Sequence, residues 1–429
     1  MTTTSAQPAP LPAGASGPVG PDGERIRIRG PLRRLLIWLA PANFAIYVLW
    51  GAIPSVLLPI QVAAVDEAGK VANLAVVSTI GAFAAMIAQP IAGALSDRTR
   101  SRFGRRAPWM VAGALVGGLA LIGMSLANGI VQIVIAWTCV QIAFNFAQGP
   151  LTAILPDRVP RAVRGTFAAV AGLAMMFGAV GGQVLGAAFA EAIGVGYVLL
   201  AGIALVAITL FVVVNREAPS TDAPRERFVL LDFVRTFWVN PIAHPDFFWA
   251  FTGRFLLYVA YFGVTAYNLY LLQDYIGLGD EAPGFVALLA LTGLLAMLPA
   301  IGVSGPLSDR LGRRKIFVFA SSVIVGLGLV VPWFVPTITG MFVMAALMGL
   351  GFGAFQAVDQ ALITEVLPDA KDYAKDLGVV NIAATLPQTI APALAGAIVW
   401  FFGFGALFPV GIVLAVLGAL AVFLIKSVR

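Results

Sequence analysis

The chain has 429 residues, of which 60% are hydrophobic and only 11% are charged, and its mean hydropathy is +0.93. A soluble globular domain is typically about 45–50% apolar and about 25% charged, so this composition excludes an ordinary soluble protein and indicates a membrane protein. The net charge of +6 would suit nucleic-acid binding, but the distribution of the charges along the chain argues against it.

The first 34 residues are polar and basic. Residues 1–24 consist mainly of Thr, Ser, Ala, Pro and Gly, and they hold too few bulky side chains to form a core, so we expect disorder. Five arginines follow, namely Arg25, Arg27, Arg29, Arg33 and Arg34. This cluster fits the anionic headgroups of a cytoplasmic lipid surface. The apolar run behind it is too long for a cleavable signal peptide and ends in no small-residue cleavage site.

Apolar runs near the roughly 20 residues needed to cross a bilayer recur along the rest of the chain. We place twelve spans at residues 35–60, 72–94, 108–127, 130–153, 166–190, 196–214, 247–272, 284–304, 316–335, 340–365, 378–401 and 404–425. A polar stretch with four prolines separates the first six from the last six. The sequence therefore predicts an all-α polytopic membrane protein in four parts: a tail at 1–34, a six-helix bundle at 35–214, a linker at 215–246 and a second six-helix bundle at 247–429.

The basic residues predict the orientation. Because each half has an even number of spans, both termini and the linker lie on one side of the membrane. All Lys and Arg residues except Lys70 and Arg254 fall in segments on that side. Cytoplasmic loops carry the excess of Lys and Arg, so we expect cytoplasmic termini in a multi-pass protein of the plasma membrane. This asymmetry accounts for the net charge without nucleic acid.

A loop motif occurs twice. Gly93–Pro108 reads GALSDRTRSRFGRRAP, and Gly305–Lys315 reads GPLSDRLGRRK. Asp309 follows Asp97 by 212 positions, and the same spacing separates the two motif glycines and the Pro-Asp pairs at 156–157 and 368–369. One spacing for three landmarks indicates a duplicated chain. In an apolar chain, a parallel repeat of two halves is a known plan of secondary transporters.

GxxxDR followed by GRR between spans 2 and 3, and again between spans 8 and 9, resembles the signature loop of the major facilitator superfamily. The longer first copy, SDRTRSRFGRRAPW, is similar to that of the glycoside–pentoside–hexuronide cation symporters and the related sucrose transporters. The resemblance implies two pseudo-symmetric six-helix bundles that rock to give alternating access. It also implies a cytoplasmic gate that latches the bundles in the outward-facing state. By position, the gate residues are Asp97, Arg105, Arg106, Asp309, Arg313 and Arg314. The alternative is that the loop arginines only set topology, and we prefer it for Arg98, Arg100 and Arg102.

Polar residues at helical spacing mark one face of several spans, and in the resembled fold spans 1, 4, 7 and 10 line the central cavity. The candidate substrate-binding residues are Asn43, Tyr47 and Trp50 in span 1; Gln141, Asn145 and Gln148 in span 4; Arg254, Tyr258, Tyr261, Thr265 and Asn268 in span 7; Gln356, Asp359 and Gln360 in span 10; and Asn381 and Gln388 in span 11. Gln360 lies 212 positions after Gln148, which suggests that spans 4 and 10 match through the repeat. The alternative role for such amides is helix–helix association, commonly worth about 1 kcal/mol or less.

Arg254 and Asp359 are the only charged residues well inside the spans. At about 1.5 Å per residue, both lie roughly 10 Å from the cytoplasmic ends of their helices. Ionisable residues inside a membrane are functional candidates and are usually paired. We hypothesise an Arg254–Asp359 ion pair that opens when Asp359 binds a proton, which couples protonation to rocking. A permanent structural pair is the alternative.

The cavity residues combine amide side chains with aromatic rings, which suits a sugar or glycoside. Three further functions stay open: proton-antiport export of an amphipathic drug or metabolite, uncoupled facilitation, and, from another class, a channel or scaffold. The resembled sodium-coupled symporters use aspartates in spans 2 and 4, but spans 1, 2 and 4 hold no carboxylate here, which disfavours sodium. Drug antiporters carry GPxxGG in span 5, where this chain reads FGAVGG at 177–182. That departure weakens the exporter interpretation, and the glycines also suit close helix packing.

We expect no enzyme, cofactor or metal site. The single histidine, His244, precedes span 7, and the single cysteine, Cys139, is expected to be a small buried hydrophobic residue. No phosphate-binding loop or nucleophile–base pair is evident. The expected partners are a small-molecule substrate, a bilayer with anionic headgroups and a proton as coupling ion, and the expected state is a monomer.

Overall fold

The computed structural model describes residues 28–221, 244–365 and 373–426, without side chains for Gln360, Thr364, Glu365 and residues 373–384. The predicted tail up to residue 27 and the linker residues 222–243 lie outside this description. The described residues form helices α1 (Pro31–Ala52), α2 (Leu58–Val65), α3 (Lys70–Arg98), α4 (Ala107–Ser125), α5 (Ile130–Arg158), α6 (Arg164–Ala188), α7 (Ile193–Val214), α9 (Pro245–Ala266), α10 (Asn268–Tyr270), α11 (Ala282–Leu311), α12 (Arg314–Phe334), α13 (Ile338–Glu365), α14 (Tyr373–Phe402) and α15 (Leu407–Ala421).

Twelve of the described helical segments are long and apolar enough to cross a membrane, as predicted. The first is composite: α1, a π-helical turn at Ile53–Leu57 and α2 run together as one span. α1 begins four residues before the predicted start of the bundle, so Arg33 and Arg34 are helical. Local sequence explains several boundaries. Prolines occupy the first turn of α1, α4, α9 and α11, where a missing N–H costs nothing, and Gly312 ends α11 with a φ of 61°.

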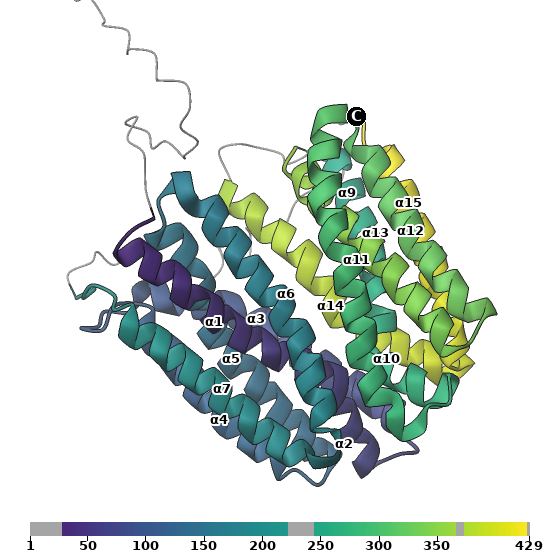
Figure 1. Cartoon of the computed structure of the whole chain (residues 1–429), viewed down its shortest axis with the longest axis horizontal. Helices are drawn as coiled ribbons and strands as arrows, with labels where there is room; N and C mark the ends of the chain where they lie inside the picture. Colours follow the sequence, from purple (N-terminus) through teal and green to yellow (C-terminus); the bar gives the residue numbers. More distant parts are fainter. Residues whose placement is uncertain (1–27, 222–243, 366–372, 427–429) are drawn as a thin grey trace, which may run out of the picture.

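The helices form two bundles with the same internal contacts (Figure 1). In the first half, α1 packs on α6 and α7, α5 packs on α3 and α4, and α4 packs on α7. In the second half, α9 packs on α14 and α15, α13 packs on α11 and α12, and α12 packs on α15. The halves meet along two equivalent seams, α3 with α14 and α6 with α11. These matching contacts confirm the pseudo-symmetric pair of six-helix bundles.

Glycines bring α6 against α1. A Cβ at Gly182 would overlap the carbonyl of Val48, and one at Gly178 would press on the carbonyl of Phe44. In the opposite direction, a Cβ at Gly51 would overlap the carbonyl of Ala179. The interpretation of the glycines near 178–182 as a close-packing surface is therefore confirmed.

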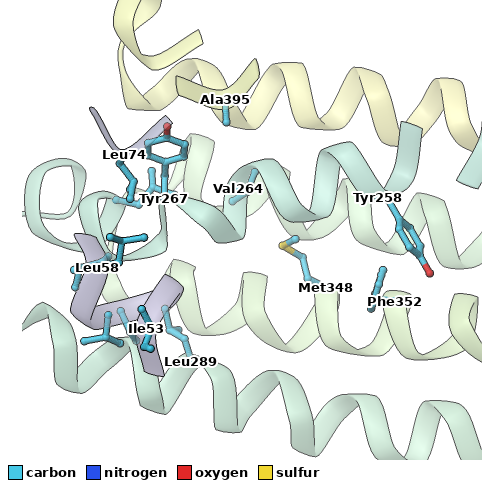
Figure 2. Packing of buried hydrophobic residues seen from close by; sticks show 14 of the residues in the cluster. Ile53, Leu58, Leu74, Tyr258, Val264, Tyr267, Leu289, Met348, Phe352 and Ala395 are labelled. Carbon is cyan, nitrogen blue, oxygen red and sulfur yellow. The ribbon is translucent and has the colours of Figure 1, made fainter. Parts of the chain in front are cut away.

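The two ends of the molecule differ. We call the end with the loops after α3 and α11 the basic end, and the first and last described residues lie there too (Figure 1). At the opposite end, which carries α2 and α10, a buried cluster joins the halves, with Ile53 and Leu58 from the first and Leu289 from the second (Figure 2). We call this end of the molecule the closed end. A second buried cluster, which includes Met110 and Phe211, belongs to the first half alone.

The outer surface is apolar, as a bilayer requires. Large hydrophobic residues such as Leu126 and Val131 are exposed, and so are the aromatic residues Trp333 and Phe334 at the end of α12 and Phe401 at the end of α14. Aromatic residues concentrate at membrane–water interfaces, so this group suits the boundary at the closed end. Cys139 is exposed on α5, so the prediction that it is buried was wrong. A small apolar residue is equally stable against lipid, and composition alone does not distinguish the two surroundings.

Candidate functional site

In the first half, polar and aromatic residues of α1 and α5 contact each other. The indole N–H of Trp50 donates to Oε1 of Gln148 at 2.8 Å, and Nε2 of Gln148 donates to the hydroxyl of Tyr47 at 3.2 Å. The Trp50 ring meets Phe144 edge-on with centroids 6.3 Å apart. Because Trp50 and Tyr47 share one amide, their rings are held in fixed positions beside α5.

The second half contains a matching cluster on α9 and α13. The hydroxyl of Tyr258 donates to Oε1 of Gln356 at 2.7 Å. Tyr261 stacks on Phe352 with centroids 4.0 Å apart and planes at 14°. Figure 2 shows Tyr258 and Phe352 facing each other across these two helices. Gln356 remains exposed despite its bond to α9, so its amide stays accessible to a solute.

The two clusters correct the predicted register between spans 4 and 10. Tyr258 corresponds to Tyr47, and its glutamine partner is Gln356, which follows Gln148 by 208 positions rather than 212. The cause is the loop before α12, because one residue separates SDR from GRR there whereas five do so in the first copy. The structural counterpart of Gln148 is therefore Gln356, not Gln360. The side chain of Gln360 lies outside the described residues.

The predicted ion pair is present. Nε of Arg254 lies 3.3 Å from Oδ2 of Asp359, and the side chains are only 6% and 3% exposed. Arg254 also donates through Nη2 to the Tyr258 hydroxyl at 3.4 Å. Nε and Nη1 of Arg254 and Oδ2 of Asp359 have no hydrogen-bond partner, so the charges attract without a well-aligned hydrogen bond. The corresponding positions in the first half are Asn43 and Leu151, so the charges occur in one half only.

The other predicted residues differ in their surroundings. Asn43 and Asn145 are buried, and each donates to the backbone of its own helix one turn earlier. The side chain of Gln141 lies against Gly81 of α3, and Thr265 bonds the carbonyl of Tyr261. These contacts suit helix packing better than ligand binding. The remaining candidates are Asn268, whose Oδ1 is buried without a partner at the start of α10, exposed Gln388 on α14, and Asn381, whose side chain lies outside the described residues.

At the basic end, the first motif copy forms a charged cluster around Arg106. Its guanidinium lies 3.0 Å from Asp97 and 2.5 Å from Asp157, and Arg105 lies 2.7 Å from Asp157. The backbone N–H of Arg106 donates to Glu217, just beyond α7. Asp97 and Asp157 both lie in the last turn of a helix, where the dipole disfavours a carboxylate, so Arg106 stabilises both. Sequence analysis missed Asp157, although its Pro-Asp pair was visible as a repeat landmark.

The second motif copy is looser. Arg314 lies 3.4 Å from Asp309, whose side chain is 68% exposed. Among the residues that the structure describes, Arg313 forms no ion pair with Asp309. The described side-chain contacts of Asp97, Arg105 and Arg106 involve only residues of the first half and Glu217. A latch between the bundles stays a prediction about the outward-facing state.

Sequence analysis also missed the contacts that close the opposite end. Nζ of Lys70, at the start of α3, lies 2.9 Å from Asp274 in the second half and 2.7 Å from Glu67. Tyr267 donates to the carbonyl of Val71, and Tyr270 donates to that of Pro59. The one signal in the sequence was that Lys70 is the only basic residue at this end.

We expect Lys70→Met to destabilise the closed end, because Asp274 then loses its partner in the other half. The fraction of molecules that are open at this end should rise about tenfold, which corresponds to a free-energy change of about 1.4 kcal/mol. Distances between spin labels on exposed residues of the two halves measure it. Asp274→Asn should have a similar effect, and the double variant should open no further than either single one, because they remove the same contact. Glu67→Gln, which removes an exposed partner, is the control. Full additivity of the two variants would contradict the interpretation.

A polytopic chain of two repeated bundles, with matching polar clusters and one closed end, has the architecture of a membrane carrier. The chain belongs to the major facilitator superfamily, because the model of that family matches residues 39–303 and 282–429. It is therefore a multi-pass membrane transporter, and the resemblance found in its loops is confirmed at the level of the family.

Relatives match over part of their length. The chain is 31% identical over 142 residues to sucrose transport protein SUC4 of Arabidopsis thaliana, covering 29% of this chain and 27% of that protein. It is 33% identical over 155 residues to a putative metabolite transport protein of Haemophilus influenzae, covering 35% and 33%. It is 29% identical over 130 residues to multidrug resistance protein Stp of Mycobacterium tuberculosis, covering 30% and 24%. These matches span only about a quarter to a third of each relative.

Solved structures share the fold over nearly the whole chain. A bacterial homologue of the human lysosomal transporter Spinster, in an inward-facing and occupied conformation, gives a TM-score of 0.71 at 13% identity, covering 92% of this chain and 97% of that one. A D-xylose–proton symporter gives 0.69 at 15% identity, covering 93% and 98%. At such identities the likeness establishes the arrangement of the helices alone.

Proposed function

We propose that the protein is a secondary active transporter that moves a sugar or glycoside by alternating access, coupled to a proton through Asp359. The observation that carries the proposal is the pair of matching clusters, Tyr47 with Gln148 and Tyr258 with Gln356, combined with an ion pair present in one half only. The clusters provide a two-sided site for a solute, and the ion pair provides a group able to bind a proton.

The orientation follows from charge. The basic end faces the cytoplasm, because Lys and Arg concentrate in cytoplasmic loops. The closed end then faces outward, and the structure corresponds to an inward-facing state. The bonds of Lys70, Tyr267 and Tyr270 between the halves hold the outer end shut in this state.

The chemistry of the clusters favours a sugar. Trp50 and Tyr261 present ring faces and edges, which pack on the apolar faces of a pyranose, while the amides of Gln148 and Gln356 are suited to hydroxyl groups. A sucrose transport protein among the relatives and a D-xylose–proton symporter among the fold neighbours support the same class. Most polar groups here already have one partner, so a bound sugar completes the network rather than creating it.

Proton coupling rests on the imperfect ion pair. A carboxylate and a guanidinium that are buried but poorly aligned gain less from each other than a bidentate pair does. Protonation of Asp359 removes the attraction and frees Arg254, which already bonds Tyr258. The proton and the solute thereby act on connected residues: Arg254 to Tyr258 to Gln356.

Export of an amphipathic compound is the second candidate. The relatives include multidrug resistance proteins, and the aromatic residues of the site suit a drug as well as a sugar. The close packing of α1 on α6 uses the same paired glycines as the span 5 element of drug antiporters, without its proline. The two candidates differ in ligand class, which makes binding the deciding measurement.

The test uses the purified protein with sugars, organic acids and cationic drugs. A bound ligand raises the melting temperature by mass action. We expect a stabilising sugar, and we expect the same sugar to show saturable counterflow in proteoliposomes, which a channel does not. Trp50→Leu should weaken that binding at least tenfold, because stacking area and a hydrogen bond are both lost. Trp333→Leu, on the outer surface of α12, is the matched control. Stabilisation by cationic drugs and by no sugar would favour the exporter instead.

A further inference from the structure

The outer surface of the second half contains an apolar groove without a function in the transport proposal. It has a volume of about 420 Å³ and lies between α11 and α12, with α13 as its floor. The lining residues are Ala296, Pro299, Ala300, Val303, Ser304, Phe317, Ala320, Ser321, Ile324, Leu350 and Ala354. Most of these side chains are small, so the helices leave space that no residue fills. On α11 and α12 the lining residues, 296–304 and 317–324, lie in the half of each helix toward the basic end.

The repeat shows how this space arises in the second half. With the register of 208, Phe317 and Ala354 correspond to Trp109 and Phe146. In the first half those two rings pack together with centroids 5.4 Å apart, and the Trp109 indole donates to Thr99 at 2.6 Å. Replacement of the Phe146 ring by the methyl group of Ala354 opens the groove. The same fold therefore has a filled site in one half and an open one in the other.

Two arginines stand at the basic end of the groove. Arg310 lies on α11 seven residues after Val303, a spacing that places both on one side of the helix. Arg313 directly precedes α12, four residues before Phe317. Both arginines are exposed, and within the described part of the chain neither has an ion-pair partner. The counterpart of Arg313 in the first half, Arg105, in contrast pairs with Asp157 and Asp97. The second half thus combines an empty apolar groove with unpaired positive charge above it.

We propose that this groove binds one molecule of an anionic phospholipid, with an acyl chain between α11 and α12 and the phosphate between Arg310 and Arg313. The groove faces the hydrocarbon region, where an acyl chain is the available apolar partner. The arginines lie at the depth of the headgroups, and each basic residue near an anionic surface contributes to lipid attraction. An ordinary lipid-facing surface has one of these features, whereas this site has both, in register on two helices.

Native mass spectrometry of the detergent-purified protein tests the proposal, with phosphatidylglycerol and phosphatidylcholine of identical chains added in turn. We expect one tightly bound phosphatidylglycerol, with affinity about tenfold above that of phosphatidylcholine. Arg310→Gln/Arg313→Gln should remove that preference. Ala354→Phe, which copies the ring of the first half, should reduce binding of both lipids. Arg33→Gln/Arg102→Gln removes two exposed charges elsewhere at the basic end and is the matched control.

Three results would overturn the proposal. Equal binding of the two lipids by the wild type would show a groove without headgroup recognition. Loss of the preference in the Arg33/Arg102 control would show general charge attraction. A dimer that disappears in Ala354→Phe would show that a second copy of the chain occupies the groove. Because the arginine variants change only exposed side chains, their result stands even if Ala354→Phe folds poorly.

Discussion

Replacement of Asp359 by Asn is expected to abolish accumulation of the substrate against its gradient when a proton gradient drives uptake. Asn has nearly the same shape as Asp, but its amide does not take up and release a proton as a carboxylate does. The site therefore loses the group that couples the proton to rocking. Counterflow, which needs no net proton movement, should persist. Proteoliposomes with and without an imposed pH gradient separate the two activities. Asp280→Asn, in an exposed turn at the closed end, is the control and should accumulate substrate normally.

A second variant distinguishes coupling from structure. Asp359→Asn leaves Arg254 buried and unpaired, and such a loss commonly costs about 3–5 kcal/mol. Arg254→Gln/Asp359→Asn removes both charges, so it should recover most of the stability without recovering proton-driven accumulation. If uptake by the double variant remains fully dependent on the proton gradient, the carboxylate is not the coupling group. If thermal stability and accumulation return together, the pair has only a structural role.

Replacement of Gly182 by Ala is expected to cause a large loss of folded protein. The new Cβ would overlap the backbone carbonyl of Val48 and press on the N–H of Ala52, and a backbone cannot rotate away as a side chain can. Overpacking commonly costs about 1–3 kcal/mol and more where the backbone must move. Because α1 and α6 would have to separate, we expect aggregation on size-exclusion chromatography and a melting temperature lower by several degrees.

Gly172→Ala is the matched control for this prediction. Gly172 lies on the same helix, and a Cβ there meets no atom within 4 Å. Ala favours helix by about 1 kcal/mol over Gly, so the control should be neutral or slightly stabilised. Equal behaviour of the two variants would show that the α1–α6 contact is looser than the structure indicates.

The sequence predicted the spans, the repeat and the Arg254–Asp359 pair for identifiable physical reasons. A bilayer demands long apolar helices, and two isolated charges in such helices have few partners other than each other. The Lys70–Asp274 contact had no comparable signal, because its residues are 204 positions apart and the sequence places both at the ends of spans, where a charge needs no partner. Likewise, spacing marked the polar face of α5 but did not show that Asn145 bonds its own helix.

The error in the predicted register between spans 4 and 10 shows a different limit of prediction from sequence. The spacing of 212 holds for the motif up to Asp309, and the shorter loop that follows changed it to 208 for α13, which carries Gln356 and Asp359. At that spacing Pro156-Asp157 falls at Thr364-Glu365, so the match of the Pro-Asp pairs at a spacing of 212 was misleading. A loop outside the membrane tolerates such a deletion, because it alters neither the length nor the packing of the spans. Contacts between helices, such as Tyr258 with Gln356, reveal the change, whereas a motif on one side of the loop does not.

This change of register has a practical consequence for chimeric proteins. Pseudo-symmetric proteins invite the grafting of a segment from one half into the other, for instance to give α5 the carboxylate of α13. A graft aligned on the SDR motif would place that group at Ala147, next to Gln148, whereas alignment on helix contacts places it at Leu151, one turn further on and opposite Asn43. Crossover points for such hybrids therefore belong within the GRR segment, where the two halves return to a common frame.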